Sequence, residues 1–277
     1  EVINRILMTK NTAILLLILT LLLVAGIFSG FMYLSKIKEM SPAVENEEQA
    51  QADTVAHETK THTEESKELF YHVSLQYPEF SGIKNKEVEA KINEDIKNSV
   101  FKAAQDFKKE IVCSTESKTA APPCELIVEF KHFEIVSQKI LSVGALYYYY
   151  IQGAHGSSVY VFSNYNTADG SAIGWKSVFR SNSDYLNNIS EYSKKELVKK
   201  LITGEDSFSD EGWIIDGTKP TQENYNSNVG FTPEGLAIAF QEYQVAAYAA
   251  GPQTVIIPYA ELKSFIEENG LLGELVK

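Results

Sequence analysis

Arginine is the scarcest charged residue in this sequence, since Arg5 and Arg180 are the only two. Acidic residues outnumber lysine and arginine by 37 to 25, which gives a formal net charge of -12. Proteins that bind nucleic acid gain most of their affinity from lysine and arginine against phosphate, and arginine is the usual reader of guanine. The composition therefore argues against nucleic acid as a partner.

Cysteine is equally scarce, with only Cys113 and Cys124, which flank a polar loop containing Pro122 and Pro123. A structural zinc site needs four ligands, and the sequence has no C-x-x-C pair to supply them, so we expect no metal and no cofactor. In an oxidising compartment the two cysteines would form one local disulfide, which would stabilise the fold by roughly 2–3 kcal/mol. In a reducing cytosol they would remain free thiols.

Charge is also missing from one long segment, which runs from Ala13 to Leu34 and consists mostly of Leu, Ile and Val. Such a segment is long enough to cross a hydrocarbon core of roughly 30 Å. It is long for a cleaved signal peptide, and no good A-x-A cleavage site follows it. The sequence predicts a signal anchor in residues 1–35, spanning the membrane once. The short flank before it favours an orientation with everything after Lys36 outside the cytoplasm, in the periplasm or extracellular space.

Large apolar residues are almost absent from residues 36–67, which are rich in Glu, Gln, Thr and Ala. Such a segment cannot bury enough surface to fold, so we predict a disordered polar linker. His57 and His62 form an H-x4-H pair within it. This spacing can bind a metal, but on a flexible polar tether we interpret both histidines as solvated.

The remaining chain alternates strand and helix patterns. A helix is predicted over 86–110, where apolar residues from Val88 to Ile111 recur at steps of three or four. In the strand at 125–138 the apolar phase changes face, which predicts a bulge near Lys131–His132. Further strands are expected at 69–77, 140–151, 157–165, 235–243 and 254–257, and further helices at 183–202, capped by Ser183, and 258–270. Residues 204–227 are expected to form a loop.

Strands clustered together, with helices between the clusters, indicate an α+β fold with a mostly antiparallel sheet. We predict two small subdomains with packed helices, at residues 68–176 and 177–270, behind the one N-terminal transmembrane helix.

Two stretches resemble known families. The first half has a strand, a long helix, a Tyr-rich strand, a G-A-H turn and an N-Y-N-T-x-D-G turn. It resembles the N-terminal domain of PdaC-type peptidoglycan deacetylases. The second half reads F-T-P-E-G-L-A-I-A-F-Q-E-Y-Q-V-A-A-Y-A-A-G and then T-V-I-I-P-Y. It resembles the C-terminal domain of RsiV-type anti-sigma factors, in which this domain follows a PdaC-type domain. The resemblance covers about Leu69 to Ile266.

The departures from these families are also informative. The metal-dependent catalytic domain of the deacetylases, with its TFDDG-type and H-x3-H motifs, has no counterpart in the sequence. Too few residues precede the apolar segment for the anti-sigma part, and Ala247 stands where the family commonly has proline. The resemblance implies the extracytoplasmic module alone, which engages the cell wall in the deacetylases and recognises lysozyme in the RsiV-like members.

His155 is the best candidate for a site, because it lies in a turn between glycines and next to tyrosines that could stack on sugars. The alternative is a histidine that caps the hairpin by bonding to backbone. Of the four tyrosines at 147–150, one alternate pair should fill the core and the other should face a ligand. The predicted binding residues are Gly153, His155, Tyr148, Tyr150, Asn164 and Tyr165.

No catalytic residue is predicted, because the sequence marks neither a paired nucleophile and base nor two juxtaposed carboxylates. We expect a membrane-anchored, extracytoplasmic binding module of the bacterial cell envelope. It would recognise cell-wall glycan or a wall-active protein such as lysozyme. Two alternatives stay open: a hydrolase of wall polymers that uses His155, and a structural envelope protein without a small ligand.

Overall fold

A computed structural model describes residues 55–277, except 112, 114–121, 204–208, 222 and 227. The predicted membrane segment from Ala13 to Leu34 lies outside these residues. Among the helices that are described, none combines the length and the apolar character needed to cross a bilayer. Residues Asp53–Lys277 form one structural unit, which is described below.

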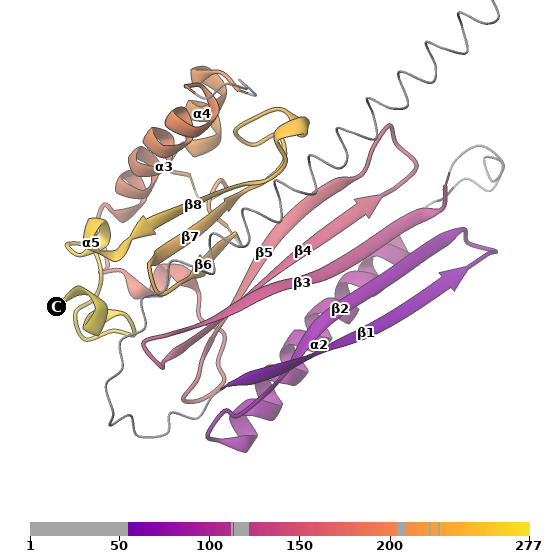
Figure 1. Cartoon of the computed structure of the whole chain (residues 1–277), viewed down its shortest axis with the longest axis horizontal. Helices are drawn as coiled ribbons and strands as arrows, with labels where there is room; N and C mark the ends of the chain where they lie inside the picture. The colour runs from indigo at the N-terminus through magenta and orange to yellow at the C-terminus, as the bar shows by residue number, and fades with distance from the viewer. Residues whose placement is uncertain (1–54, 112, 114–121, 204–208, 222, 227) are drawn as a thin grey trace, which may run out of the picture. The chain divides into compact units, whose positions relative to one another are not determined.

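The first part of this unit is a five-stranded sheet with the strand order β1-β2-β3-β4-β5 (Figure 1). All neighbours are antiparallel except β2 and β3, which are parallel and are connected through the helix α2. The five strands are β1 (Ala56–Ser66), β2 (Tyr71–Ser81), β3 (Cys124–Val136), β4 (Ile140–Tyr150) and β5 (Ser157–Asn166).

Helix α2 (Lys86–Glu110) covers one face of this sheet, and its predicted bounds are confirmed. Asn85 caps its first turn by accepting hydrogen bonds from the backbone N–H groups of Glu87 and Val88. The predicted apolar stripe is buried, and its inward-pointing alanine is Ala104. The stripe packs against β2, β3 and β4 through Val88, Ile92, Ile96, Val100, Ala104 and Phe107.

Strand β1 corrects the prediction of a disordered linker for residues 56–66. This segment has no large apolar residue, but it pairs with β2 along its whole length, from Ala56 opposite Ser81 to Ser66 opposite Tyr71. Backbone hydrogen bonds at the sheet edge therefore order a polar segment that could not bury a core of its own. Most of the predicted linker precedes residue 55 and lies outside the described residues.

Strand β2 also differs from its prediction, because it continues through Pro78, where we expected it to end. Its pairing with β3 stops at Leu75, so at Pro78 it has a strand neighbour on one side only. Proline is tolerated where its missing N–H faces no ladder partner.

The bulge in β3 is confirmed by a register shift between Phe130 and His132. On β4, Tyr147 and Tyr149 pack toward the core under α2, as predicted for one alternate pair. Ile151, the last residue of the strand predicted at 140–151, lies beyond the end of β4 and is 67% exposed.

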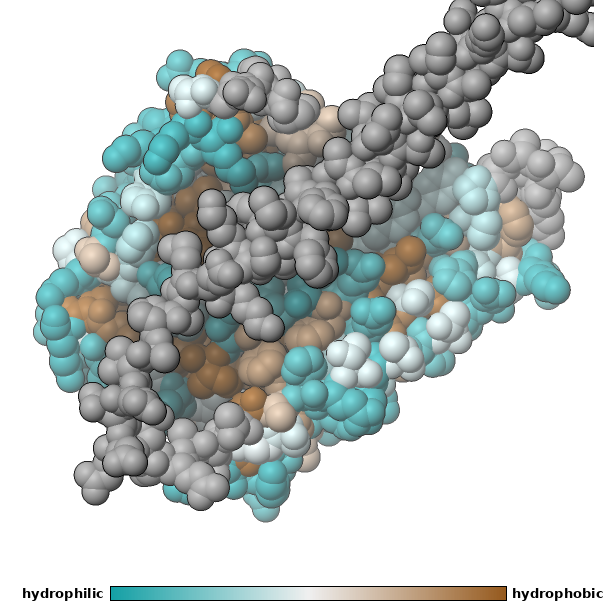
Figure 2. Space-filling model, in the orientation of Figure 1, coloured by the Kyte–Doolittle hydropathy of each residue, from teal (hydrophilic) through white to brown (hydrophobic). Residues whose placement is uncertain are grey.

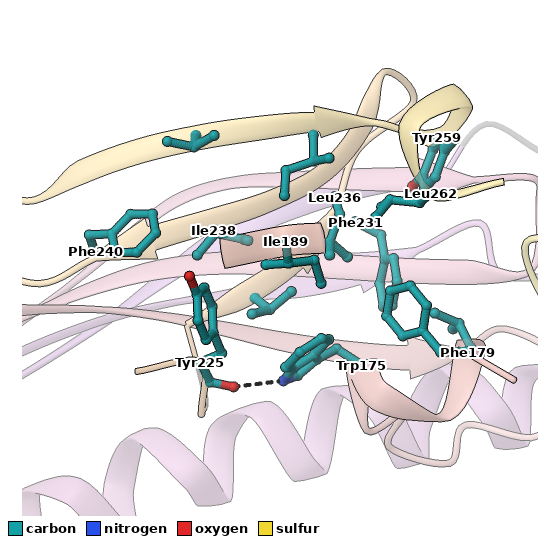
Figure 3. Packing of buried hydrophobic residues seen from close by; sticks show 14 of the residues in the cluster. Trp175, Phe179, Ile189, Tyr225, Phe231, Leu236, Ile238, Phe240, Tyr259 and Leu262 are labelled. Atoms are coloured by element: carbon teal, nitrogen blue, oxygen red, sulfur yellow. Dashed lines mark hydrogen bonds between the residues drawn. The ribbon is translucent and has the colours of Figure 1, made fainter. Parts of the chain in front are cut away.

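The second part is a three-stranded antiparallel sheet of β6 (Val229–Phe231), β7 (Gly235–Phe240) and β8 (Gln253–Pro258), in that order. Helices α3 (Tyr185–Leu201) and α4 (Glu211–Thr218) belong to this part. Figure 3 shows the core, where Ile189 from α3 meets Ile238 and Leu236 from β7. Trp175 is buried there, where its Nε1–H donates to the carbonyl oxygen of Tyr225, so it is a packing residue of this core.

Several boundaries of the second part were predicted wrongly. The expected loop 204–227 contains α4, and β6 was missed. The last helix, α5, is only Tyr259–Leu262, because the chain turns after it. The residue at the N-cap of α3 is Asp184, while the hydroxyl of Ser183 donates to the carbonyl of Arg180.

The two sheets are connected by side chains of one sheet that hydrogen-bond to, or pack against, the edge strand of the other. Asn164 on β5 accepts a hydrogen bond from the hydroxyl of Ser142 at 2.7 Å and donates one to the carbonyl of Val229 on β6 at 3.0 Å. Phe162 lies against Gly230, where an added Cβ would be 2.2 Å from its ring. On the face shown in Figure 2, the coloured surface is mostly hydrophilic, with hydrophobic residues in smaller patches.

Candidate functional site

The turn between β4 and β5 places the ring of His155 at the surface. Its Nδ1 is 2.7 Å from the carbonyl oxygen of Gly156, so Nδ1–H is the donor there. Its Nε2 is 3.1 Å from the hydroxyl of Tyr243, and in the neutral ring Nε2 accepts that hydrogen bond. The backbone bond predicted by the capping interpretation is therefore present, but the second nitrogen also reaches the other sheet's loop.

Three aromatic rings meet at this point. The ring of His155 lies 4.1 Å from that of Tyr248 at an interplanar angle of 30°. The rings of Tyr243 and Tyr248 are 5.7 Å apart and stacked, also at 30°. We call His155, Tyr243 and Tyr248 the aromatic cluster.

The loop between β7 and β8 holds Tyr243 in an unusual backbone conformation. Tyr243 has a φ of 63°, in the left-handed region that residues with a Cβ rarely adopt. The indole Nε1–H of Trp213 on α4 donates to the carbonyl of Tyr243 at 2.8 Å, which helps to hold that conformation. Strained backbone of this kind is concentrated at functional sites, and Tyr243 is 49% exposed.

Tyr148 lies beside the aromatic cluster, on the face of β4 opposite to α2. Its ring packs on Gly156, where an added Cβ would be 2.2 Å from the ring carbons. Partial burial raises the pKa of the Tyr148 phenol, and the nearby charges of Glu125 and Glu242 raise it further. The phenol of Tyr150 also raises the pKa of Tyr148. The structure thus brings the predicted residue Tyr148 to the turn that carries His155 and the exposed Gly153, and Tyr150 lies near Tyr148 on the same strand.

Two side chains of the β7–β8 loop hold it against the edge of β5. Gln241 accepts from the N–H of Tyr160 at 2.7 Å and donates to its carbonyl at 2.9 Å, as a paired strand would. The carboxylate of Glu242 accepts from the N–H of Ser158 at 2.9 Å. These contacts fix the position of Tyr243 relative to the His155 turn.

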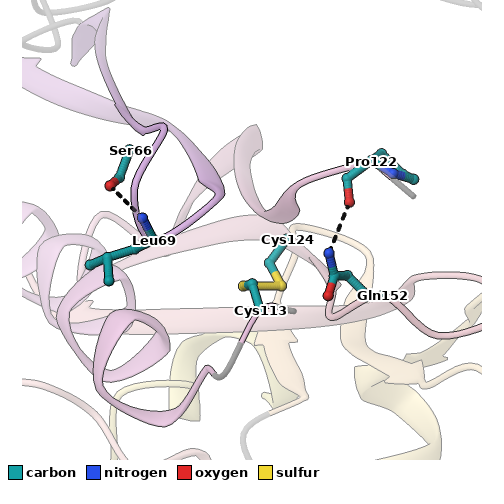
Figure 4. Close-up of a disulfide and its surroundings, with 6 residues drawn as sticks. All are labelled: Ser66, Leu69, Cys113, Pro122, Cys124 and Gln152. Carbon is teal, nitrogen blue, oxygen red and sulfur yellow. Dashed lines mark hydrogen bonds between the residues drawn. A yellow bond between two sulfur atoms is a disulfide. The ribbon is translucent and has the colours of Figure 1, made fainter. Parts of the chain in front are cut away.

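The predicted disulfide between Cys113 and Cys124 is confirmed and lies at the same end of the sheet (Figure 4). Cys124 N–H donates to the carbonyl of Phe70, which fixes the disulfide against the β1–β2 turn. Gln152 in the His155 turn donates to the carbonyl of Pro122 at 3.4 Å.

Asn164 and Tyr165 are corrected as binding residues, because the structure buries both near the opposite end of β5. Asn164 connects the two sheets, as described above. The hydroxyl of Tyr165 donates to a carboxylate oxygen of Asp95 on α2 at 2.9 Å. Burial, and then Asp95, raise the pKa of the Tyr165 phenol well above its ordinary value.

Tyr243, Tyr248 and Gln241 were not predicted as site residues. The sequence does show two tyrosines shortly after a buried strand, but their meeting with His155 depends on the joining of the two sheets. The left-handed backbone conformation of Tyr243 also cannot be predicted from the composition of the sequence.

The arrangement can do what exposed aromatic rings with polar edges do: stack on the apolar face of a sugar or a protein loop, and hydrogen-bond at the rim. Within the described residues no group of His, Cys, Asp and Glu side chains is placed to hold a metal ion.

The fold and the site define an α+β protein in which two domains share one exposed aromatic cluster. A family model described as "Deacetylase PdaC" matches residues 63–158, and one described as "Protein of unknown function (DUF3298)" matches residues 176–260. The chain carries a PdaC-type domain followed by a DUF3298 domain, which confirms the order inferred from the sequence.

One curated relative is the peptidoglycan-N-acetylmuramic acid deacetylase PdaC of Bacillus subtilis (strain 168), which is 28% identical over 199 residues. The match covers 72% of this chain and 40% of that protein, so this chain spans less than half of the relative's length.

Two solved structures of DUF3298 family proteins share the fold. One, from Pseudomonas aeruginosa PAO1, has a TM-score of 0.53 at 12% identity, covering 77% of this chain and 94% of that one. The other, from Bacteroides fragilis NCTC 9343, has a TM-score of 0.52 at 16% identity, covering 80% and 96%.

Proposed function

We propose that this protein is an extracytoplasmic binding module of the bacterial cell envelope. The support is the PdaC-type domain, whose curated relative is named for acting on peptidoglycan. The Cys113–Cys124 disulfide adds to it, since disulfides persist in oxidising compartments outside the cytoplasm.

The proposal includes a membrane anchor from Ala13 to Leu34, with residues 68–176 and 177–270 as two subdomains on its outer side. The apolar sequence of that segment supports the anchor. Its deletion should move the protein from the membrane fraction to the soluble fraction.

The ligand we propose is the glycan strand of peptidoglycan, bound at the aromatic cluster. The observation that carries this is the surface group of His155, Tyr243 and Tyr248, in which His155 and Tyr243 are exposed and Tyr248 is half-buried, held in place by Gln241 and Trp213. Aromatic faces beside hydrogen-bonding edges suit the alternating apolar and hydroxyl surfaces of a sugar.

The test is co-sedimentation of the full chain with insoluble peptidoglycan. Tyr248→Ala and His155→Ala should each reduce retention by roughly tenfold, as expected for the loss of about 1.4 kcal/mol of stacking and hydrogen bonding. His62→Ala is the matched control, because His62 also lies against a ring, that of Phe101, but on β1 at the far edge of the sheet.

Retention that is absent, or unchanged in both variants, contradicts the glycan assignment. A parallel pulldown with lysozyme distinguishes the other ligand inferred from the family resemblance. Retention of lysozyme that is lost in Tyr248→Ala, without binding to peptidoglycan, would reassign the aromatic cluster to a wall-active protein.

A further inference from the structure

The two sheets of the described unit have four edges, formed by β1, β5, β6 and β8. The molecule closes two of them with its own side chains. On β5, Gln241 pairs with the backbone of Tyr160. On β6, the N–H of Phe231 donates to the hydroxyl of Ser142, and Val229 accepts from Asn164. At these positions, backbone groups that the two edges would offer to another chain are already bonded.

The β8 edge is different, and the pattern of hydrogen bonds shows which groups point outward. Ala239 N–H donates to Asn228, and the Gly235 carbonyl accepts from Thr232, so the odd-numbered residues of β7 direct their backbone groups toward β6. In an antiparallel strand the backbone groups of successive residues point to alternate sides. The N–H and C=O groups of Leu236, Ile238 and Phe240 therefore point toward β8.

The β8 residues opposite these three are Ile257, Val255 and Gln253, so their backbone N–H and C=O groups point toward β7. Thr254 and Ile256 therefore direct their N–H and C=O groups away from the sheet. Neither residue makes a backbone hydrogen bond to any other part of the chain that the structure describes.

A groove of about 300 Å³ runs along this edge, between residues 254–256 and the α3 side chains Glu196, Lys199 and Lys200. Ile256 is 45% exposed, so an apolar side chain is available beside the free backbone groups. Lys199 and Lys200 form no ion pair with a described residue, although the chain as a whole carries a net charge of -12. The groove thus carries two lysines against the one carboxylate of Glu196, and this local excess of positive charge on an acidic protein favours a negatively charged occupant.

We propose that the β8 edge is a strand-addition site for an extended, acidic peptide segment of a partner protein. The segment would pair its backbone with Thr254 and Ile256, place one alternate side chain near Ile256, and direct its carboxylates to Lys199 and Lys200. This is the recognition mode in which main-chain hydrogen bonds give affinity and alternate side chains give specificity. The site lies outside the aromatic cluster and does not depend on it.

The test uses the full chain and a short fluorescent peptide that alternates valine and glutamate. Fluorescence anisotropy should show saturable binding, and hydrogen–deuterium exchange should slow at residues 253–258. The same peptide with lysine in place of glutamate, or with N-methylated backbone amides, should bind at least roughly tenfold more weakly.

Two pairs of variants separate the strand edge from the fold. Ile256→Pro removes one outward N–H, which an edge strand tolerates, and should abolish binding, whereas Ile256→Val should retain it. Lys199→Glu combined with Lys200→Glu should weaken binding roughly tenfold, whereas Lys194→Glu with Lys195→Glu, on the same helix outside the groove, should not.

Equal binding of the N-methylated or lysine peptide, or unchanged exchange at 253–258, would overturn the proposal. So would a concentration-dependent dimer that Ile256→Pro disrupts, since the edge would then serve a second copy of this chain. Tyr248→Ala should leave peptide binding unchanged, so failure here and failure of glycan binding are separate results.

Discussion

At the scale of single residues, Gly156 is the position where the site has least room. Gly156→Ala would place a Cβ 2.2 Å from the Tyr148 ring, which must then move. We expect a loss of about 1–3 kcal/mol in the free energy of unfolding, as for other overpacking changes, together with weaker peptidoglycan retention. Urea denaturation and co-sedimentation measure the two effects. Gly174→Ala is the control, because an added Cβ there meets nothing within 4 Å; equal stability of the two variants would contradict the packing argument.

His132 gives the chain a predicted dependence on pH. Its Nδ1 lies 3.0 Å from the Tyr160 hydroxyl, and burial lowers the pKa of the imidazole. The folded state therefore binds the proton less readily than the unfolded state. The stability from neutral His132 is fully present above the ordinary pKa of about 6.5 and is lost as the pH falls from there toward the folded pKa.

Urea denaturation at about pH 7.5 and about pH 5 tests this dependence. The free energy of unfolding of the wild type should fall more between these values than that of His132→Gln, which has no titrating group at this position. A parallel fall in both proteins would show that His132 does not carry the effect.

Residue types alone predicted the positions of some residues of the candidate site. His155 could be predicted, because glycines on both sides imply an accessible turn. The direction of alternate tyrosines on β4 followed from strand periodicity. Tyr243 and Tyr248 could not be predicted, because their positions depend on a left-handed backbone and on contacts across two sheets.

At the scale of elements, the most informative contact is the one between the Gln241 side chain and the edge of β5. Gln241→Ala removes two hydrogen bonds to Tyr160, and we expect a loss of about 1–3 kcal/mol in stability. Amide exchange at Tyr160 should accelerate. Gln105→Ala, on the exposed side of α2, is the matched control and should be neutral. Unchanged exchange at Tyr160 would show that Gln241 does not close the edge.

Elements with a strong local pattern could be predicted, and those defined by partners could not. Helix α2 has an apolar stripe and a capping Asn85, and the β3 bulge shows as a change of apolar face. Strand β1 has no apolar periodicity, because it is an edge strand ordered by β2. Helix α4 is short and lies within a polar stretch, so its burial of Ile214 was not visible in the pattern.

At the scale of the whole molecule, the disulfide is the covalent constraint on the PdaC-type domain. It closes a loop with a sequence separation of 11 residues, and reduction should lower the free energy of unfolding by roughly 2–3 kcal/mol. Thermal denaturation with and without reductant measures this. The double variant Cys113→Ser, Cys124→Ser should lose the same stability and show no response to reductant; a response in that variant would point to another cause.

The order of the two domains could be predicted from sequence motifs, and the α+β class from the spacing of strands and helices. The way the domains join could not, because it depends on polar side chains such as Asn164 and Gln241 that have no distinctive spacing. These same contacts have a consequence for the autonomy of the first domain.

A polypeptide cut just after β5 would lack Gln241, Glu242 and β6, so the main-chain groups of Ser158 and Tyr160 would meet solvent or another copy. We expect such a fragment to self-assemble through β5, whereas the longer chain should not self-assemble through this strand. Any protein that uses the first domain beside a different neighbour would then have to supply its own cover for β5. By covering the edge of β5, the DUF3298 domain in this chain would thus also prevent polymerisation through that strand.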